Sequence, residues 1–333
     1  MSFLDKISNR SERVVRTEPS QLDAALSLEQ DEYQPRMGSS VFGGMLAQES
    51  SSKQRRVCGN AECTNSFAMP WRNRRRPIFE EQWGCSGRCV LAMVRTVLRR
   101  EQVERKLGPT TQPHRHRVPL GLVMLAQGWI TNPQLQKALS QQRASGSGRI
   151  GDWLVAECGL ETDQVTRGLS VQWGCPVLTT DGFSSQEMAL VMPRMFVEEF
   201  GMLPLRVAGS RLIYLGCEDR PDASVAFAVE RMSGLKAESG LVEAKELYAA
   251  RTRLYESDGV AVEVESAADE DALASRVTAL LEAKQPLASR LVRLHHYYWL
   301  RIWLESGTKG QDGNVPADNE DMQDYLFTLG SRA

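Results

Sequence analysis

Four cysteines in the N-terminal third of the chain have the number and pairing of a metal site. Cys58 and Cys63 enclose four residues, Cys85 and Cys89 enclose three, and twenty-one residues separate the two pairs. Two close pairs of thiolates joined by a loop can surround one tetrahedral Zn2+. We predict a structural zinc site without catalytic activity, because four thiolates leave no coordination position for a substrate. Four free thiols, buried or half-buried, are the alternative.

A second group of residues forms an internal repeat. The chain reads PLGLVMLAQGWITNPQLQKALSQQ over 119–142 and RIGDWLVAECGLETDQVTRGLSVQ over 149–172. Six pairs of matching residues lie thirty positions apart: Leu120 and Ile150, Gly121 and Gly151, Met124 and Leu154, Leu135 and Val165, Leu139 and Leu169, and Gln142 and Gln172. A fixed period of this kind indicates two copies of one structural unit.

Helix and turn signals predict the same helical hairpin in both copies. In the first copy, Pro119 suits a helix start, Gly128 a left-handed helix end, and Thr131 the cap of a second helix. In the second copy, Gly159 and Thr162 are the corresponding signals, each one residue later than the thirty-residue offset. Neither hairpin can bury its apolar side alone, so we expect the two to pack together with rough two-fold symmetry.

The segment after the repeat predicts a small mixed α/β unit. PRMFVEEFG reads as a helix ended by Gly201, and LPLRV with RLIYLG as a β-hairpin around residues 208–210. DASVAFAVERMSG and KELYAARTRLYE have the apolar spacing of amphipathic helices, and CPVL, from Cys175, predicts a short strand.

In this order, the repeat and the α/β unit resemble the N-terminal domain of type II secretion and type IV pilus assembly ATPases, the GspE or MshEN family. The resemblance covers roughly residues 118–256. It implies a nucleotide-binding or partner-binding role, since some members bind cyclic di-GMP with the two motifs. The resemblance assigns these residues to a ligand: Arg117, Leu120, Gly121, Gln142, Arg149, Ile150, Gly151 and Gln172.

These residue types suit a cyclic dinucleotide. Arginine supplies charge and a planar donor face, glycine lets the backbone approach a phosphate, and aliphatic side chains cover guanine faces. Two copies suit a ligand that is itself two-fold, so Gly121 and Gly151 should lie near one shared surface. The sequence departs from the family pattern at Pro119, where a leading arginine is expected and Arg117 is the nearest substitute. It departs again at Cys158, which replaces a glycine.

The ATPase motor of the family is not expected in this sequence. The phosphate-binding pattern G-x-x-x-x-G-K-[ST] occurs nowhere in it. We therefore expect a non-enzymatic adaptor or receptor that binds cyclic di-GMP or a protein of the secretion or pilus machinery.

The rival hypothesis is a zinc-dependent regulator that binds nucleic acid. The segment from Lys53 to Arg117 holds 15 Lys or Arg and 5 Glu, a net charge of +10, whereas the whole chain carries −2. An aromatic and basic cluster lies between the two cysteine pairs: Trp71, Arg72, Arg74, Arg75 and Arg76. Such a cluster can bind phosphates, but a solvated charged face is the simpler explanation.

Composition places the chain among ordinary globular proteins, with 42% apolar and 25% charged residues. It has no apolar run of about 18 residues and no signal peptide, so we expect a cytoplasmic protein without membrane insertion.

The expected fold class is α+β, a helical-hairpin repeat followed by a small mixed α/β unit and preceded by a four-cysteine, zinc-ribbon-like module. The expected segments are a disordered tail (1–56), the basic four-cysteine module (57–106), a linker (107–117), the GspE/MshEN-like domain (118–256), C-terminal helices (264–304) and a flexible tail (305–333). The second of the C-terminal helices, over 286–304, is expected to carry one apolar stripe: Leu287, Leu291, Leu294, Tyr298 and Ile302.

Overall fold

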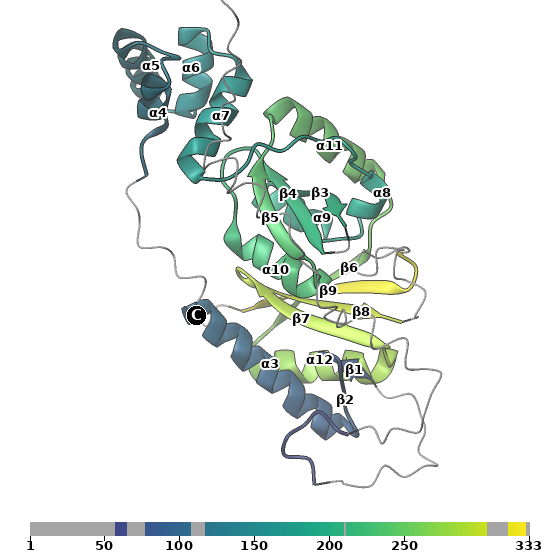
Figure 1. Ribbon diagram of the computed structural model, residues 1–333. Helices are drawn as coiled ribbons and strands as arrows, with labels where there is room; N and C mark the ends of the chain where they lie inside the picture. The colour runs from purple at the N-terminus through teal and green to yellow at the C-terminus, as the bar shows by residue number, and fades with distance from the viewer. Residues whose placement is uncertain (1–56, 65–76, 108–116, 210, 305–318, 331–333) are drawn as a thin grey trace, which may run out of the picture. The chain divides into compact units, whose positions relative to one another are not determined.

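The computed structural model describes residues 57–64, 77–107, 117–209, 211–304 and 319–330 (Figure 1). The tail predicted over 1–56, the basic cluster from Trp71 to Arg76 and nearly all of the predicted linker lie outside these residues. In chain order the elements are β1 (Ile78–Phe79), β2 (Gln82–Trp83), α3 (Gly87–Leu107), α4 (Leu120–Ala126), α5 (Asn132–Ser145), α6 (Ile150–Cys158), α7 (Thr162–Trp173), α8 (Ser185–Met188), α9 (Arg194–Phe200), β3 (Met202–Ala208), β4 (Leu212–Cys217), α10 (Ala223–Ser233), β5 (Lys236–Leu241), α11 (Ala244–Glu256), β6 (Ala261–Ala267), α12 (Glu270–Lys284), β7 (Ala288–Leu294), β8 (Tyr297–Trp303) and β9 (Met322–Leu329).

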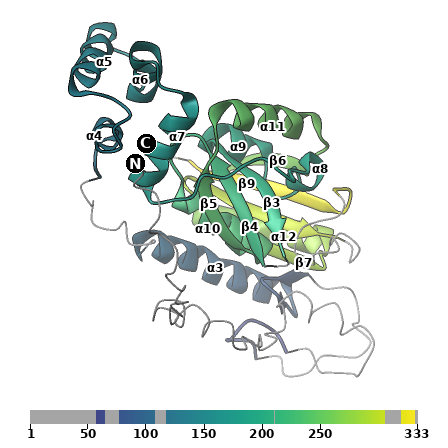
Figure 2. The ribbon, with the colours of Figure 1, turned by 45° about the horizontal axis from the view of Figure 1, so that its top comes forward.

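Helices α4 to α7 form the two predicted helical hairpins (Figure 2). Gly128 (φ 70°) and Gly159 (φ 68°) adopt the left-handed conformation after the first helix of each copy, as predicted. Thr131 begins α5 in a capping box, also as predicted. In the second copy the cap of α7 is Glu161, so the prediction of Thr162 is wrong by one residue. The caps Thr131 and Glu161 are thirty residues apart, whereas the turn glycines Gly128 and Gly159 are thirty-one residues apart.

The two hairpins share one apolar core, which confirms that they pack together. Its buried members are Leu120, Met124, Ile130, Leu135, Ala138, Leu154 and Leu160. Val165 and Leu169 of α7 pack against this core from the second copy. The repeat is therefore a single structural body rather than two separate hairpins.

Residues after the repeat form the predicted α/β unit. Its three-stranded sheet has the order β3–β4–β5, with β3 antiparallel and β5 parallel to β4. Helix α10 connects β4 to β5, and Asp222 caps it by accepting hydrogen bonds from two backbone amides. Gly201 (φ 65°) ends α9 in the left-handed conformation, as predicted. The strand predicted at CPVL is reduced to an isolated bridge between Val177 and Leu241.

A four-stranded sheet follows, in the order β6–β9–β8–β7 (Figure 1). The prediction of a helix over 286–304 is wrong, because this stretch is the antiparallel hairpin β7–β8. His295 (φ 52°) lies in the left-handed region within the tight turn between the strands. The preceding prediction of a helix from residue 264 is corrected as well, since β6 occupies that position and α12 begins at Glu270.

The physical reason for this error is burial of β8 on both faces. Tyr298 and Ile302 lie in one apolar core, and Trp299 on the opposite face lies in another. A strand buried on both faces lacks the polar residues that normally mark every second position. Its apolar residues can then be read with helical spacing as easily as with strand spacing.

The prediction of a flexible tail over 305–333 is wrong for residues 319–330. Strand β9 lies inside the sheet, parallel to β6 and antiparallel to β8. Tyr325, Leu326 and Phe327 are buried. The acidic, Gly-rich residues that precede this strand obscured a short run of residue types that favour strands.

Helices α3 and α12 cover one face of this sheet (Figures 1 and 2). Helix α3 buries Val90, Val94 and Val97, which follow one another at helical spacing. The core that these helices share with the sheet includes Phe79, Val90, Val94, Val97, Leu98, Leu273, Val277, Leu281, Leu291, Tyr298, Tyr325 and Phe327. The four-cysteine module therefore shares its core with the C-terminal region. In the sequence, these two segments lie before and after residues 118–256.

A buried ion pair connects the C-terminal sheet to the α/β unit. Arg301 on β8 donates to Asp324 on β9 through Nε (2.8 Å to Oδ1) and Nη2 (2.7 Å to Oδ2). Its Nη1 donates to the carbonyl oxygens of Leu190 (2.8 Å) and Val191 (3.0 Å), which precede α9. Trp299 Nε1 also donates to Asp324 Oδ1 (2.8 Å). This network leaves the guanidinium and the carboxylate fully engaged within the protein.

Candidate functional site

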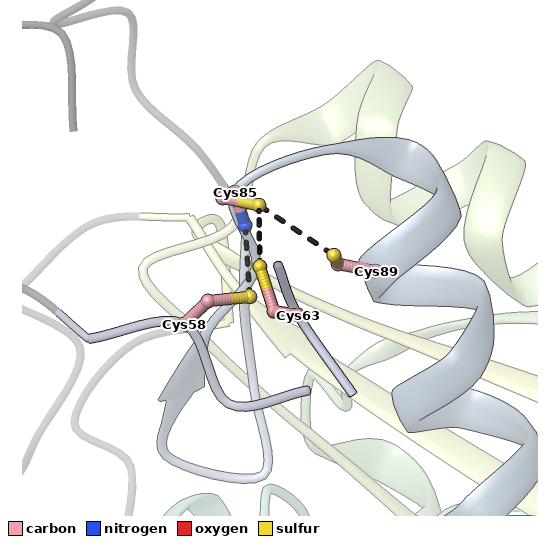
Figure 3. A group of neighbouring side chains, drawn as sticks. All are labelled: Cys58, Cys63, Cys85 and Cys89. Carbon is pink, nitrogen blue, oxygen red and sulfur yellow. Dashed lines mark hydrogen bonds between the residues drawn. The ribbon is translucent and has the colours of Figure 1, made fainter. Parts of the chain in front are cut away.

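The four cysteines converge, as the spacing predicted. The sulfur atoms of Cys58, Cys63, Cys85 and Cys89 all lie within 4.8 Å of one another, and Figure 3 shows them turned toward a common centre. The Sγ atom of Cys85 is 3.5 Å from those of Cys63 and Cys89. Ligands about 2.3 Å from a tetrahedral zinc ion are separated by about 3.8 Å, so the observed spacing fits one ion.

Local structure brings the two cysteine pairs together. The first pair lies in the loop 57–64, and the amide of Gly59 donates to the Trp83 carbonyl (2.9 Å) at the end of β2. The second pair lies at the start of α3, where Cys89 occupies the first turn. The backbone amide of Cys85 faces Cys58 Sγ at 3.5 Å, a contact that stabilises a thiolate.

The electrostatics of the cluster favour a bound cation. Burial and hydrogen bonds with the neighbouring thiols raise the pKa of Cys85 to about 12. Burial also acts to raise the pKa of Cys89, but hydrogen bonds from Asn60 and Ser86 outweigh it and lower that pKa to about 7. Thiols this close cannot all ionise unless a positive charge lies between them. The donor set therefore fits a zinc ion held by four thiolates.

Two glutamines connect the copies of the repeat in a crossed arrangement. Gln142 of the first copy donates to the carbonyl of Gly148 (3.0 Å), just before the first helix of the second copy. Gln172 of the second copy donates to the carbonyl of Val118 (2.8 Å), just before the first helix of the first copy. Both donors and both acceptors are thirty residues apart. Each copy thus holds the backbone that leads into the other, as rough two-fold symmetry requires.

The glycines of the two motifs serve close packing. A Cβ atom at Gly121 would lie 2.6 Å from Leu135 Cδ1, and one at Gly151 would lie 2.9 Å from Val165 Cγ1. Real Cβ atoms do not approach other atoms so closely, so each glycine lets the two helices of its hairpin approach. The Leu120 side chain lies 3.9 Å from the same Cβ position at Gly151, which places the two helix starts side by side.

Arg149, the leading arginine of the second motif, is held by carboxylates. Its Nη2 atom is 2.5 Å from Glu218 Oε1, and its Nη1 atom contacts Asp219 on the same loop. Its Nε atom is 3.5 Å from Asp152, the third residue of α6. The hydrogen bond to Glu218 is the main cause of a raised pKa for Arg149. About half of the Arg149 side chain (53%) stays exposed, so an anionic ligand can reach the guanidinium.

Arg117, the candidate in the first motif, lies over an aromatic ring. Its guanidinium carbon is 3.6 Å from the centre of the Trp173 ring, and that of Arg220 is 5.3 Å from the same ring. A pocket of about 420 Å³ opens beside them, with Phe227 and Glu230 in its wall. Sequence reasoning missed Trp173 and Arg220, although an aromatic residue directly after the repeat was a usable signal.

One loop contacts both ends of the second copy of the repeat. The segment between β4 and α10 places Glu218 and Asp219 on Arg149 and places Arg220 over Trp173. The start of the second copy therefore faces two carboxylates. Trp173, at the end of the same copy, lies against two guanidinium groups, those of Arg117 and Arg220.

No helix within the described ranges is long and apolar enough to cross a membrane.

Comparison with known proteins relates part of the chain to a secretion and pilus family. No family model matches the chain. It is 28% identical over 148 residues to the type IV pilus assembly ATPase PilB of Myxococcus xanthus (strain DK1622), a match covering 43% of this chain and 25% of that protein. The chain thus spans about a quarter of the length of the curated relative it matches.

Solved structures give similar coverage. MshE with cdg shares 22% sequence identity with a TM-score of 0.35, covering 42% of this chain and 100% of that one. The N-terminal domain of XpsE shares 17% identity with a TM-score of 0.29, covering 40% and 92%. Over about two-fifths of its length, the chain is similar to the N-terminal domain of type II secretion and type IV pilus assembly ATPases, as its repeat predicted.

Proposed function

We propose that the chain is a non-enzymatic adaptor whose repeat binds cyclic di-GMP and whose remaining surfaces engage a protein of a secretion or pilus assembly system. The observation that carries this proposal is the crossed pair of glutamines, Gln142 and Gln172. They hold two like backbone segments next to each other, with Arg149 at one helix start and Arg117 close to the other. A two-fold dinucleotide presents two phosphates and two bases, and so matches a paired arrangement of this kind.

Charge supports an anionic ligand at this place. Arg149 and Arg117 stay on the surface of the repeat, and Arg220 adds a third guanidinium near the first motif. A phosphate that pairs with Arg149 replaces contacts to Glu218 and Asp219, so binding exchanges one set of anions for another. That exchange lowers the net binding free energy gained at Arg149 below the value for an arginine without carboxylate partners.

The proposed cofactor is one structural zinc ion at the four-cysteine cluster. A bound zinc ion would cross-link the loop 57–64 to the start of α3. Its four thiolate ligands would leave no coordination position open for a substrate. The proposed absence of enzymatic activity rests on this closed donor set and on the lack of a phosphate-binding loop in the sequence. The described residues add nothing in favour of nucleic acid binding, because the basic cluster from Trp71 to Arg76 lies outside them.

Calorimetric titration of the full chain with cyclic di-GMP tests the proposal. We expect saturable binding at one dinucleotide per repeat, and a loss of about tenfold or more in affinity for Arg149→Ala, because charge-assisted hydrogen bonds contribute about 1.5–3 kcal/mol each. The matched control is Arg167→Ala, which removes an exposed arginine of α7 that pairs with Asp163 within its own helix. No heat of binding, or equal affinity for the wild type and Arg149→Ala, would refute the assignment of this ligand.

A further inference from the structure

Two carboxylates cover part of the outer edge of strand β7. β7 is a terminal strand of the sheet β6–β9–β8–β7. On its outer side, the amide of Leu291 donates to Glu80 Oε1 (2.9 Å) and the amide of Arg293 donates to Glu101 Oε2 (3.0 Å). Glu101 is 3% exposed, so this cap is itself buried. An uncovered edge with free amides would be ready to pair with another chain.

The hairpin β1–β2 covers the beginning of the same edge. The amide of Ile78 donates to the Pro286 carbonyl (3.1 Å), and the amide of Glu80 donates to the Ser289 carbonyl (2.9 Å). The Ser289 hydroxyl donates to the Ile78 carbonyl (2.8 Å). Together with Glu101 on α3, this hairpin satisfies the β7 edge along most of its length.

The turn of that hairpin has an unfavourable backbone that its side chains explain. Glu80 (φ 49°) and Glu81 (φ 65°) occupy the two central positions, where asparagine and glycine are usual. A side chain with a Cβ atom is disfavoured in this region. Both carboxylates are used, since Glu80 holds the Leu291 amide and Glu81 pairs with Arg290 (2.6 Å). Glycine or asparagine at these positions would relax the turn but would leave the edge without its acceptors.

The four-cysteine cluster connects the parts of this cover. The loop of the first cysteine pair is hydrogen-bonded to the end of β2 through Gly59, and Cys85 lies two residues after the last residue of β2. Cys89 lies at the start of α3, the helix that carries Glu101. A metal ion shared by the four sulfurs therefore fixes the hairpin and the helix to each other.

We propose that metal binding at the four cysteines controls access to the β7 edge, and that the uncovered edge binds an extended, acidic peptide segment. Charge selects the partner, because Arg290 on β7 pairs with Glu81 of the present cover and two further glutamates, Glu80 and Glu101, accept the hydrogen bonds of the edge amides. An acidic strand reproduces both the backbone pairing and the ion pair of Arg290 with the present cover. This inference rests on the zinc site of the proposed function and is independent of cyclic di-GMP.

Amide hydrogen exchange on the full chain tests the first half of the proposal. Zinc content is measured by elemental analysis in the same samples, so failure to bind metal is seen separately. On chelation, we expect exchange at Leu291 and Arg293 to accelerate about tenfold or more. The amides of Ile213 and Leu215, on β4 in the core on the other face of the C-terminal sheet, should keep their rates and so report that the chain stays folded. Equal exchange at β7 with and without zinc would overturn the proposal.

Matched variants and a peptide probe test the second half. Cys63→Ser should reproduce the effect of chelation, whereas Cys158→Ser, at a half-buried thiol outside the cluster, should not. The probe is a synthetic peptide of residues 77–84, PIFEEQWG, which is the cover itself. It should slow exchange at Leu291 and Arg293 in the zinc-free protein and have no effect on the zinc-loaded protein. An accelerated edge that the peptide fails to protect would overturn the docking assignment.

Discussion

The structure predicts a large loss of stability for the substitution Asp324→Asn. Asp324 is fully buried, and both of its oxygens accept hydrogen bonds from Arg301, which is 2% exposed. Asparagine keeps the shape but removes the charge, and its amide nitrogen must face a guanidinium nitrogen, donor against donor. Arg301 would then be a buried cation without an anion, held by the one remaining side-chain oxygen and by the carbonyl oxygens of Leu190 and Val191.

The expected magnitude follows from the burial of both partners. Removing one partner of a buried pair costs about 3–5 kcal/mol, because the remaining charge stays out of water. Domains are typically stable by about 5–15 kcal/mol, so this loss should shift the urea unfolding midpoint strongly. Urea unfolding of the full chain, followed by circular dichroism and tryptophan fluorescence, measures it. The double variant Arg301→Met with Asp324→Leu should recover much of the loss, since apolar residues of similar volume often replace a buried pair without penalty.

The control for this experiment is an exposed pair in the same sheet. Glu265 on β6 pairs with Arg276 on α12 at 2.6 Å, and their side chains are 26% and 47% exposed. Glu265→Gln should cost less than about 1 kcal/mol, as solvent screens such pairs. If Asp324→Asn costs as little as this control, burial does not set the cost of breaking the pair.

Three further outcomes are expected. Purified protein should carry about one equivalent of zinc by elemental analysis and lose it in Cys63→Ser, whereas metal-free protein with four rapidly titrating thiols would contradict the site. Gly121→Ala should destabilise the repeat by about 1–3 kcal/mol in thermal or urea unfolding, because the new Cβ would lie 2.6 Å from Leu135 Cδ1; an unchanged midpoint would show that the helices can separate without penalty. The hydrogen bond from Arg276 lowers the pKa of Glu265 in the folded protein, so this pair stabilises the fold above the unfolded-state pKa of about 4.3. Its contribution disappears as pH falls through the lower pKa of the folded state, so the stability difference between wild type and Glu265→Gln should shrink between pH 7 and pH 3. A stability difference that grows toward acid pH would contradict the assigned sign.

Local signals explain which parts of the fold could be predicted from the sequence. The helical hairpins follow from residues close in sequence, such as Gly128 and Thr131, whose preferences for turns and caps act over a few positions. The β7–β8 hairpin has no such marker, because its turn uses His295 in a conformation more usual for glycine or asparagine. Its assignment depends on burial by distant elements, which no short window of sequence contains.

The candidate sites divide in the same way. Two cysteine pairs indicate a metal site because few other structures need four thiols at such spacing. The sulfurs of Cys58 and Cys89 do lie close together in the structure. The neighbours of the arginines were not predictable, since Glu218 and Trp173 reach Arg149 and Arg117 only after the repeat and the α/β unit have folded. Spacing shows which residues are repeated, but not which charges will face them.

The core shared by α3 and the C-terminal sheet has a consequence for synthesis on the ribosome. Val90, Val94 and Val97 leave the exit tunnel long before Leu273 and Tyr298, which cover them in the finished protein. The repeat draws its core from residues nearer in sequence, so it is able to fold before the apolar face of α3 is covered. During that interval the nascent chain presents a helix that a chaperone can recognise and that other nascent chains can aggregate with. Premature termination after residue 256 would make this interval permanent, so such fragments should be cleared by quality control instead of persisting as partial adaptors.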